Sequence, residues 1–188
     1  MSISREFART LPGWAMRSSH SIQPTDAIGA IERAEAIVVG GGNTFHLLRG
    51  LYRAGVDDVI RERVRTGMPY VGWSAGSNVA CPTIKTTNDM PIVEPPTLNA
   101  LGLVPFQINP HYTDARIEGH MGETRDERLT EFTHASPGVR VIGLREGTML
   151  RIEGDEITLL GGKPARIFVK DEPPRDISPE ESLSFLLH

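Results

Sequence analysis

A serine between two glycines is the strongest chemical signal in this sequence. Residues 70–76 read Tyr-Val-Gly-Trp-Ser-Ala-Gly, an apolar strand pattern that runs into the motif Gly-x-Ser-x-Gly around Ser74. In a nucleophile elbow, this motif forms a sharp turn between a strand and a helix and exposes the serine hydroxyl. The helix that follows directs N–H groups and its positive dipole end at the same place. We therefore predict that Ser74 is a nucleophile; a glycine-rich turn without a catalytic role is the alternative.

Three consecutive glycines at positions 40–42 mark a second strand-to-helix junction, directly after Val39. Without Cβ atoms these residues can adopt positive φ and bring backbone N–H groups close to a ligand. A phosphate site is the alternative, but the spacing is not Gly-x-Gly-x-x-Gly and no Gly-Lys-Ser/Thr follows. Beside a nucleophile we interpret the loop as part of an oxyanion hole. Its N–H groups would come from Gly41 and Gly42, and another from Ala75, directly after the serine.

A nucleophilic serine needs a base, and His111 is the best placed of the six histidines. It follows the apolar residues 104–108, at the carboxyl end of an expected strand, where sites of α/β proteins collect. Two acids could orient its ring. Asp89 precedes the histidine, and Glu146 follows another strand end. Because triads occur in several chain orders, the order does not choose between them.

The polar segment 118–125 offers two interpretations. Glu118, His120 and Glu123 could bind a divalent metal together with His111, but the spacing lacks His-Glu-x-x-His and we predict no metal. The other interpretation is a substrate pocket, in which Arg125 pairs with a carboxylate and Glu118 or Glu123 with an ammonium group.

The elements that must position these residues alternate along the chain. Strand-like runs cover 36–39, 68–73, 104–108, 139–144, 149–152, 156–160 and 166–169, and helical patterns cover 25–34, 44–56, 75–81 and 123–135. The alternation predicts an α/β fold, a doubly wound and mostly parallel sheet with helices on both faces. The last three runs lack helices between them, and the turn signal at 153–155 predicts a C-terminal β-hairpin extension.

Composition excludes several classes of function. The 20 Lys and Arg residues against 24 Asp and Glu give a net charge of −4, without the positive footprint of a nucleic-acid binder. The apolar runs are too short to span a bilayer, and we expect neither a membrane nor a nucleic-acid partner. The lone Cys81 excludes an intrachain disulfide and a multi-cysteine zinc site. We predict a cytoplasmic protein with one domain over residues 1–188.

Several sequence blocks together resemble the peptidase E family of serine peptidases. The blocks are Gly40–Phe45, Gly72–Gly76, Cys81–Val93, Asn109–His111 and Gly122–Arg125. The resemblance implies cytoplasmic cleavage of dipeptides with an N-terminal aspartate, without metal or organic cofactor, on a fold related to class I glutaminase domains and flavodoxin-like sheets.

The resemblance also implies roles. Ser74 would be the nucleophile and His111 the base, while Asp89 and Glu146 both match acids placed near the histidine. Substrate-binding residues carried over by motif are Asn43, Glu123 and Arg125, the last expected to grip the aspartate side chain.

One departure from the family pattern affects the expected assembly. Family members start earlier, with another strand–helix–strand unit, which leads us to expect exposed sheet edges covered by a partner subunit, in a homodimer. Two alternatives stay open: an inactive binding module with the same fold, and a related serine peptidase or amidase of different specificity.

Overall fold

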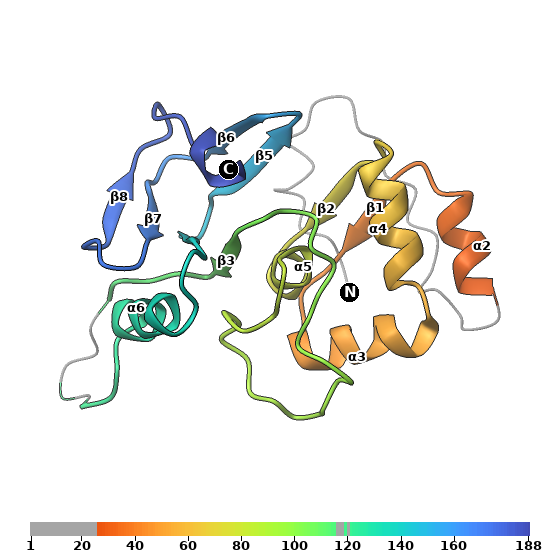
Figure 1. Cartoon of the computed structure of the whole chain (residues 1–188), viewed down its shortest axis with the longest axis horizontal. Coiled ribbons are helices and arrows are strands. Elements are labelled where there is room, and N and C mark those ends of the chain that lie inside the picture. The colour runs from red at the N-terminus through yellow and green to blue at the C-terminus, as the bar shows by residue number, and fades with distance from the viewer. Residues whose placement is uncertain (1–25, 116–118, 120) are drawn as a thin grey trace.

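The computed structural model describes residues 26–115, 119 and 121–188. Glu118 and His120, candidates for a metal or ammonium site, lie outside these residues. The described strands gather at the two sides of a central short helix, α5 (Ala75–Ala80) (Figure 1). The predicted α/β class is confirmed.

The first group is a parallel pair, β1 (Ile37–Val39) and β2 (Tyr70–Gly72). Buried side chains of this half form one apolar cluster that also takes in Leu48 and Ile60. The helices around it are α2 (Ala27–Glu32), α3 (Thr44–Ala54) and α4 (Asp57–Arg65). The predicted strand–helix alternation is therefore present here.

The second group is a four-stranded mixed sheet in the order β3-β4-β7-β8, beside α6 (Arg125–Ala135). Its strands are β3 (Gln107–Pro110), β4 (Val141–Leu144), β7 (Ala165–Phe168) and β8 (Arg175–Ile177). The β3–β4 pair is parallel, whereas β7 and β8 are antiparallel to their neighbours. A short 3-10 helix, η2 (Ser184–Leu187), packs Leu186 into the same core.

Helix α5 contacts strands of both groups, β1, β2 and β3. The β3 edge that faces away from β4 is covered by side chains: Ile108 N–H donates to Cys81 Sγ at 3.1 Å, and its carbonyl accepts from Thr86 Oγ1 at 2.9 Å. Asn88 Nδ2 donates to the carbonyl of Pro110 at 2.9 Å. The backbone groups on this edge of β3 therefore have partners within the chain.

The C-terminal hairpin is confirmed as β5 (Met149–Glu153) and β6 (Glu156–Leu160), which pair antiparallel. Two elements were not predicted, α4 and β8. In α4 only Ile60 is buried, so its apolar stripe is weak, and its helix is supported instead by acids in the first turn and arginines in the last. In β8 only Ile177 is buried.

Candidate active site

Ser74 lies on a strained turn between β2 and α5, as the elbow interpretation predicts. Its φ of 55° and ψ of −117° fall where non-glycine residues are rare, at a strain of about 1–3 kcal/mol. The flanking glycines permit the turn, because a Cβ on Gly76 would lie 2.1 Å from the Val39 carbonyl oxygen. A Cβ on Gly72 would lie 2.6 Å from the carbonyl oxygen of Gly76. The glycines of the motif are therefore required by the close approach of β1, β2 and α5.

The glycine loop lies against this serine. A Cβ on Gly41 would be 3.2 Å from Ser74 Cβ and 3.5 Å from its Oγ, so a side chain there would crowd the hydroxyl. Gly42 has a φ of 142°, in the region that favours glycine. Within residues 26–115, 119 and 121–188, the N–H groups of Gly41, Gly42 and Ala75 have no hydrogen-bond acceptor. They are therefore available to a ligand, as an oxyanion hole requires.

His111 directly follows β3 and contacts Glu146, which follows β4. The His111 Nδ1 atom and the Glu146 Oε1 atom form a hydrogen-bonded pair. Their side chains are 52% and 73% exposed, so the pair faces solvent. His111 also has a positive φ, 54°. Among the described non-glycine residues, only Ser74 and Asp171 also have a positive φ. The parallel β3–β4 pairing brings the two ends together.

Asp89, the other candidate acid, contacts Thr44 instead of His111. Its Oδ2 accepts from the Thr44 N–H at 2.7 Å and from the Thr44 hydroxyl at 2.6 Å. A third donor is Thr87 Oγ1, at 3.2 Å. This carboxylate therefore lies at the N-terminus of α3, where the helix dipole favours negative charge.

The segment around Asp89 connects the two halves of the site. Asp89 holds the start of α3, directly after the glycine loop, and Asn88 donates to the carbonyl of Pro110, directly before His111. Thr44, Thr87 and Asn88 were not among the predicted site residues. Their short polar side chains are typical of residues that cap turns and helix ends, and this was the signal available.

Arg125 begins α6 and has no carboxylate partner among the described residues. It lines a small polar pocket with Thr113, Asp114, Ala115, Thr124 and Asp126. Partial burial, and then the nearby charge of Arg128, lower the pKa of this guanidinium from its usual value. A half-buried guanidinium that forms no ion pair with a described carboxylate is a favourable place for a substrate carboxylate.

The other two predicted substrate residues already have partners. Asn43 caps α3, because its side-chain oxygen accepts from the His46 N–H at 3.1 Å, and its Nδ2 donates to the Met90 carbonyl at 2.8 Å. The exposed Glu123 lies 3.6 Å from Arg128 Nε. Their roles toward substrate stay predictions.

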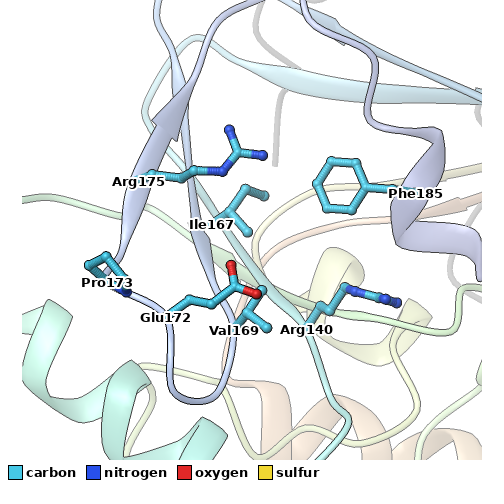
Figure 2. Close-up of a pocket in the computed structure, with 7 residues that line it drawn as sticks. All are labelled: Arg140, Ile167, Val169, Glu172, Pro173, Arg175 and Phe185. Carbon is cyan, nitrogen blue, oxygen red and sulfur yellow. The ribbon is translucent and has the colours of Figure 1, made fainter.

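A second pocket, of about 240 Å³, contains no predicted site residue. It lies between β7, β8 and η2, as Figure 2 shows, and its lining includes Arg140, Glu172, Arg175 and Phe185. In the described part of the chain, no group of three or more His, Cys, Asp or Glu side chains is arranged to hold a metal ion. No described helix is long and apolar enough to cross a membrane.

Comparisons with known sequences identify the family of this chain. The pattern of peptidase family S51 matches residues 7–160. A peptidase E from Nostoc sp. is 51% identical over 175 residues, which are 93% of this chain and 72% of that protein. A peptidase E from Shewanella amazonensis is 56% identical over 158 residues, 84% of this chain and 67% of that protein.

Solved structures give the same result for the fold. A candidate peptidase E from Listeria monocytogenes EGD-e matches with a TM-score of 0.59 and 28% identity, over 72% of this chain and 64% of that one. A peptidase from an acI-B1 Actinobacterium matches with a TM-score of 0.57 at 20% identity, over 84% and 62%. The match therefore spans less than two thirds of either solved chain.

Proposed function

The chain belongs to peptidase family S51, and from that premise we propose that it is a serine dipeptidase that cleaves after an N-terminal aspartate in short peptides. The observation that carries the proposal is the strained Ser74 turn, with the Gly41 backbone against its side chain and with the N–H of Ala75, which has no acceptor among the described residues, directly after it. Strain of this kind persists where a function needs the exposed side chain.

The reaction proceeds through an acyl-enzyme. Ser74 Oγ attacks the carbonyl carbon of the N-terminal aspartate residue while His111 accepts the hydroxyl proton. Because Nδ1 faces Glu146, Nε2 is the nitrogen that serves as base. The N–H groups of Ala75 and of the glycine loop stabilise the tetrahedral oxyanion; losing one such donor typically costs ~10²–10³ in rate.

The second half of the reaction returns the enzyme to its starting state. Protonated His111 gives its proton to the leaving amine, the peptide C–N bond breaks and the second amino acid departs. Water then attacks the ester carbonyl with His111 again as base, and free aspartate leaves from Ser74. The Glu146 carboxylate orients the ring and stabilises the imidazolium that forms in both halves.

Arg125 supplies the selectivity for aspartate. Its guanidinium is half-buried and has no carboxylate partner among the described residues, and its planar fork can bind a carboxylate at two points. Charge-assisted hydrogen bonds of this kind are worth roughly 1.5–3 kcal/mol. Glu123 is proposed to bind the free ammonium group of the substrate, which would require it to turn from Arg128.

The test is hydrolysis of Asp-Leu, Asn-Leu and Ala-Leu by the full chain. We expect cleavage of Asp-Leu, loss of turnover in Ser74→Ala and full activity in Ser182→Ala, which changes an exposed serine near the C-terminus. Arg125→Met should abolish the preference for Asp-Leu over Asn-Leu. If wild type and Ser74→Ala are equally inactive on all three dipeptides, the proposal is contradicted. Unimpaired cleavage of N-acetylated Asp-Leu would contradict the proposed role of Glu123 in binding the ammonium group.

A homodimer and a cytoplasmic location also belong to the proposal. Met90 and Ile92 are 76% and 64% exposed in the loop that Asn43 contacts, an apolar surface that association would cover. Cys81 is free and fully buried, which fits a reducing compartment. Light scattering that gives the mass of a single 20.6 kDa chain would contradict the dimer.

A further inference from the structure

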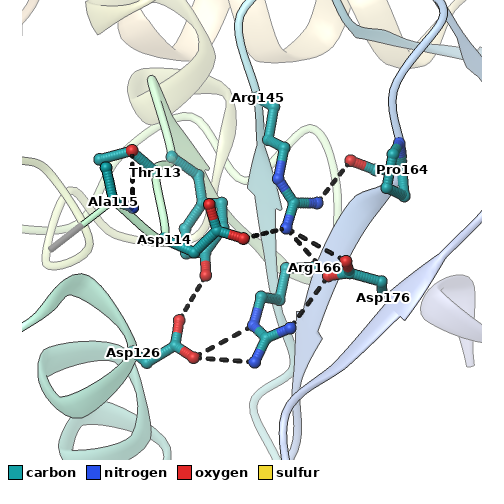
Figure 3. Close-up of polar contacts among 9 residues, drawn as sticks. Thr113, Asp114, Ala115, Asp126, Arg145, Pro164, Arg166 and Asp176 are labelled. Carbon is teal, nitrogen blue, oxygen red and sulfur yellow. Dashed lines mark hydrogen bonds and ion pairs between the residues drawn. The ribbon is translucent and has the colours of Figure 1, made fainter.

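Figure 3 shows a chain of alternating acidic and basic side chains that are joined by hydrogen bonds and ion pairs. It joins the loop after β3, the end of β4, the start of α6 and strands β7 and β8. We name it the charge network, and its members are Tyr112, Asp114, Asp126, Arg145, Arg166 and Asp176.

Asp176 is the centre of the charge network. Its Oδ1 accepts from Arg145 Nη2 and from Arg166 Nη1, both at 3.1 Å. Arg145 also donates from Nη2 to Asp114 Oδ2 at 2.9 Å and from Nη1 to the Pro164 carbonyl at 2.8 Å. The two arginine side chains are only 13% and 22% exposed, so these contacts are less screened by solvent than ordinary surface pairs.

The other end of the charge network reaches α6. Arg166 donates to Asp126 Oδ2 from Nη2 at 2.9 Å and from Nε at 3.1 Å, and the Tyr112 hydroxyl donates to Asp126 Oδ1. Both oxygens of Asp126 are therefore engaged. This carboxylate does not form an ion pair with its chain neighbour Arg125, which stays available for a substrate.

Tyr112 is fixed from several sides. It is 2% exposed, its N–H donates to the Leu144 carbonyl at 2.9 Å, and the Arg145 guanidinium lies 5.2 Å above its ring. A Cβ on Gly143 would lie 2.6 Å from the ring, so the ring packs directly on the β4 backbone. Because Tyr112 is fixed in this way, a shift of β4 or of Arg145 should also shift Tyr112.

Three members of the charge network are direct chain neighbours of predicted site residues. The neighbouring pairs are His111–Tyr112, Arg125–Asp126 and Arg145–Glu146. The base, its acid and the substrate-binding cation thus each sit one residue from a member of the same network.

We propose that the charge network is a positioning device that sets the spacing between the His111–Glu146 pair and Arg125, with Asp176 as its central positioning residue. The inference rests on the proposed function for the roles of the three site residues. Loss of the Asp176 charge leaves the mostly buried guanidinium groups of Arg145 and Arg166 without the carboxylate that they share. They separate, and Arg145 carries the β4 end, with Glu146, away from His111.

The experiment compares Asp176→Asn with Asp171→Asn in the full chain. Asp171 is the matched control, since it is also an aspartate beside a basic side chain, with Oδ1 3.8 Å from His134 Nδ1, and asparagine tolerates its φ of 63°. Asp-Leu hydrolysis gives kcat and KM, circular dichroism reports folding, and ring nitrogen NMR reports the tautomer of neutral His111, assigned by loss of its signals in His111→Gln.

We expect Asp176→Asn to lower kcat by about 10-fold or more, since a misplacement of ~1 Å can cost ~10²-fold. Its neutral His111 should change from the Nδ1-protonated tautomer, which Glu146 selects, to a mixture. Asp171→Asn should match wild type in both. A folded Asp176→Asn protein with unchanged kcat and a single tautomer would overturn the proposal.

A milder variant keeps the test decisive if Asp176→Asn does not fold. Tyr112→Phe removes only the hydroxyl that joins Tyr112 to Asp126, and it should raise KM for Asp-Leu with a smaller change in kcat. An unchanged KM would overturn the proposal. Wild type that does not cleave Asp-Leu would contradict the proposed function alone, because the tautomer comparison does not depend on turnover.

Discussion

The two halves of the candidate site are held by different forces. Ser74 is fixed by backbone geometry: a positive φ, and glycines where β1, β2 and α5 approach too closely for any side chain. His111 and Glu146 are largely exposed and contact each other across the ends of β3 and β4, and in our proposal the charge network positions them. The serine half should therefore tolerate no added atoms, whereas the histidine half should be sensitive to charge and salt.

Gly76→Ala tests the backbone half and should have the largest effect. Its Cβ would lie 2.1 Å from the Val39 carbonyl oxygen, so β1 or α5 must shift. We expect a loss of about 3 kcal/mol or more in the free energy of unfolding, and no activity. Gly50→Ala is the control, because nothing lies within 4 Å of its Cβ; it should stabilise α3 by about 0.5–1 kcal/mol. Urea unfolding measures both, and an unperturbed Gly76→Ala protein would disprove the close approach.

Glu146→Gln tests the charged half at its centre. The amide cannot stabilise the imidazolium as the carboxylate does, but the exposed pair is open to water, so we expect kcat to fall roughly 100-fold, less than for a buried triad acid. Stability should change little because exposed ion pairs contribute at most about 1 kcal/mol. Glu153→Gln, which removes the exposed pair with Arg151, should leave kcat unchanged. Similar kcat values for wild type and Glu146→Gln would exclude an orienting role.

Asp89→Asn separates the two acids that the sequence could not rank. Its carboxylate accepts from Thr44 at the start of α3, so we expect a loss of about 1–2 kcal/mol in the free energy of unfolding. The fall in kcat should be much smaller than in Glu146→Gln. If kcat falls further in Asp89→Asn than in Glu146→Gln, then Asp89 is the orienting acid.

The smallest expected effect is on the pH dependence of stability, through Asp114, a largely exposed member of the charge network. The hydrogen bond to Arg145 lowers the pKa of Asp114 below its ordinary value, so their pairing stabilises the fold above that ordinary value and is lost as the pH falls through the lowered pKa. Because Asp114 is mostly exposed, its contribution should stay below about 1 kcal/mol. Thermal unfolding of wild type and Asp114→Asn should differ slightly at pH 7, and the difference should shrink as the pH falls below the ordinary pKa of the carboxyl group. A difference that grows in acid would contradict this sign.

The contrast between the halves also explains what the sequence could predict. Where the backbone has no room for a side chain the sequence must have glycine, and glycines are visible in a sequence. The elbow and the oxyanion loop could therefore be predicted from the motif around Ser74 and from positions 40–42. The contact between His111 and Glu146 could be named only as one of two possibilities, because β3–β4 pairing brings together residues 35 positions apart.

The remaining features lack a local sequence signal. Arg145, Arg166 and Asp176 look like ordinary surface charges, and only the pairing of β4 with β7 and of β7 with β8 joins them. The strand expected at 104–108 forms at Gln107–Pro110, because Phe106 is buried in the core without joining the ladder to β4. Apolar character predicts burial there, but not backbone pairing.

The pairing of Ser74 with His111 is the central claim, and the rate of phosphonylation by a small fluorophosphonate tests it most directly. Intact mass followed by peptide mapping locates the adduct. Wild type should carry one adduct, on Ser74, and His111→Gln should react at least about 100-fold more slowly, as expected when a general base is removed. Equal rates in the two proteins, or an adduct on another residue, would contradict the account.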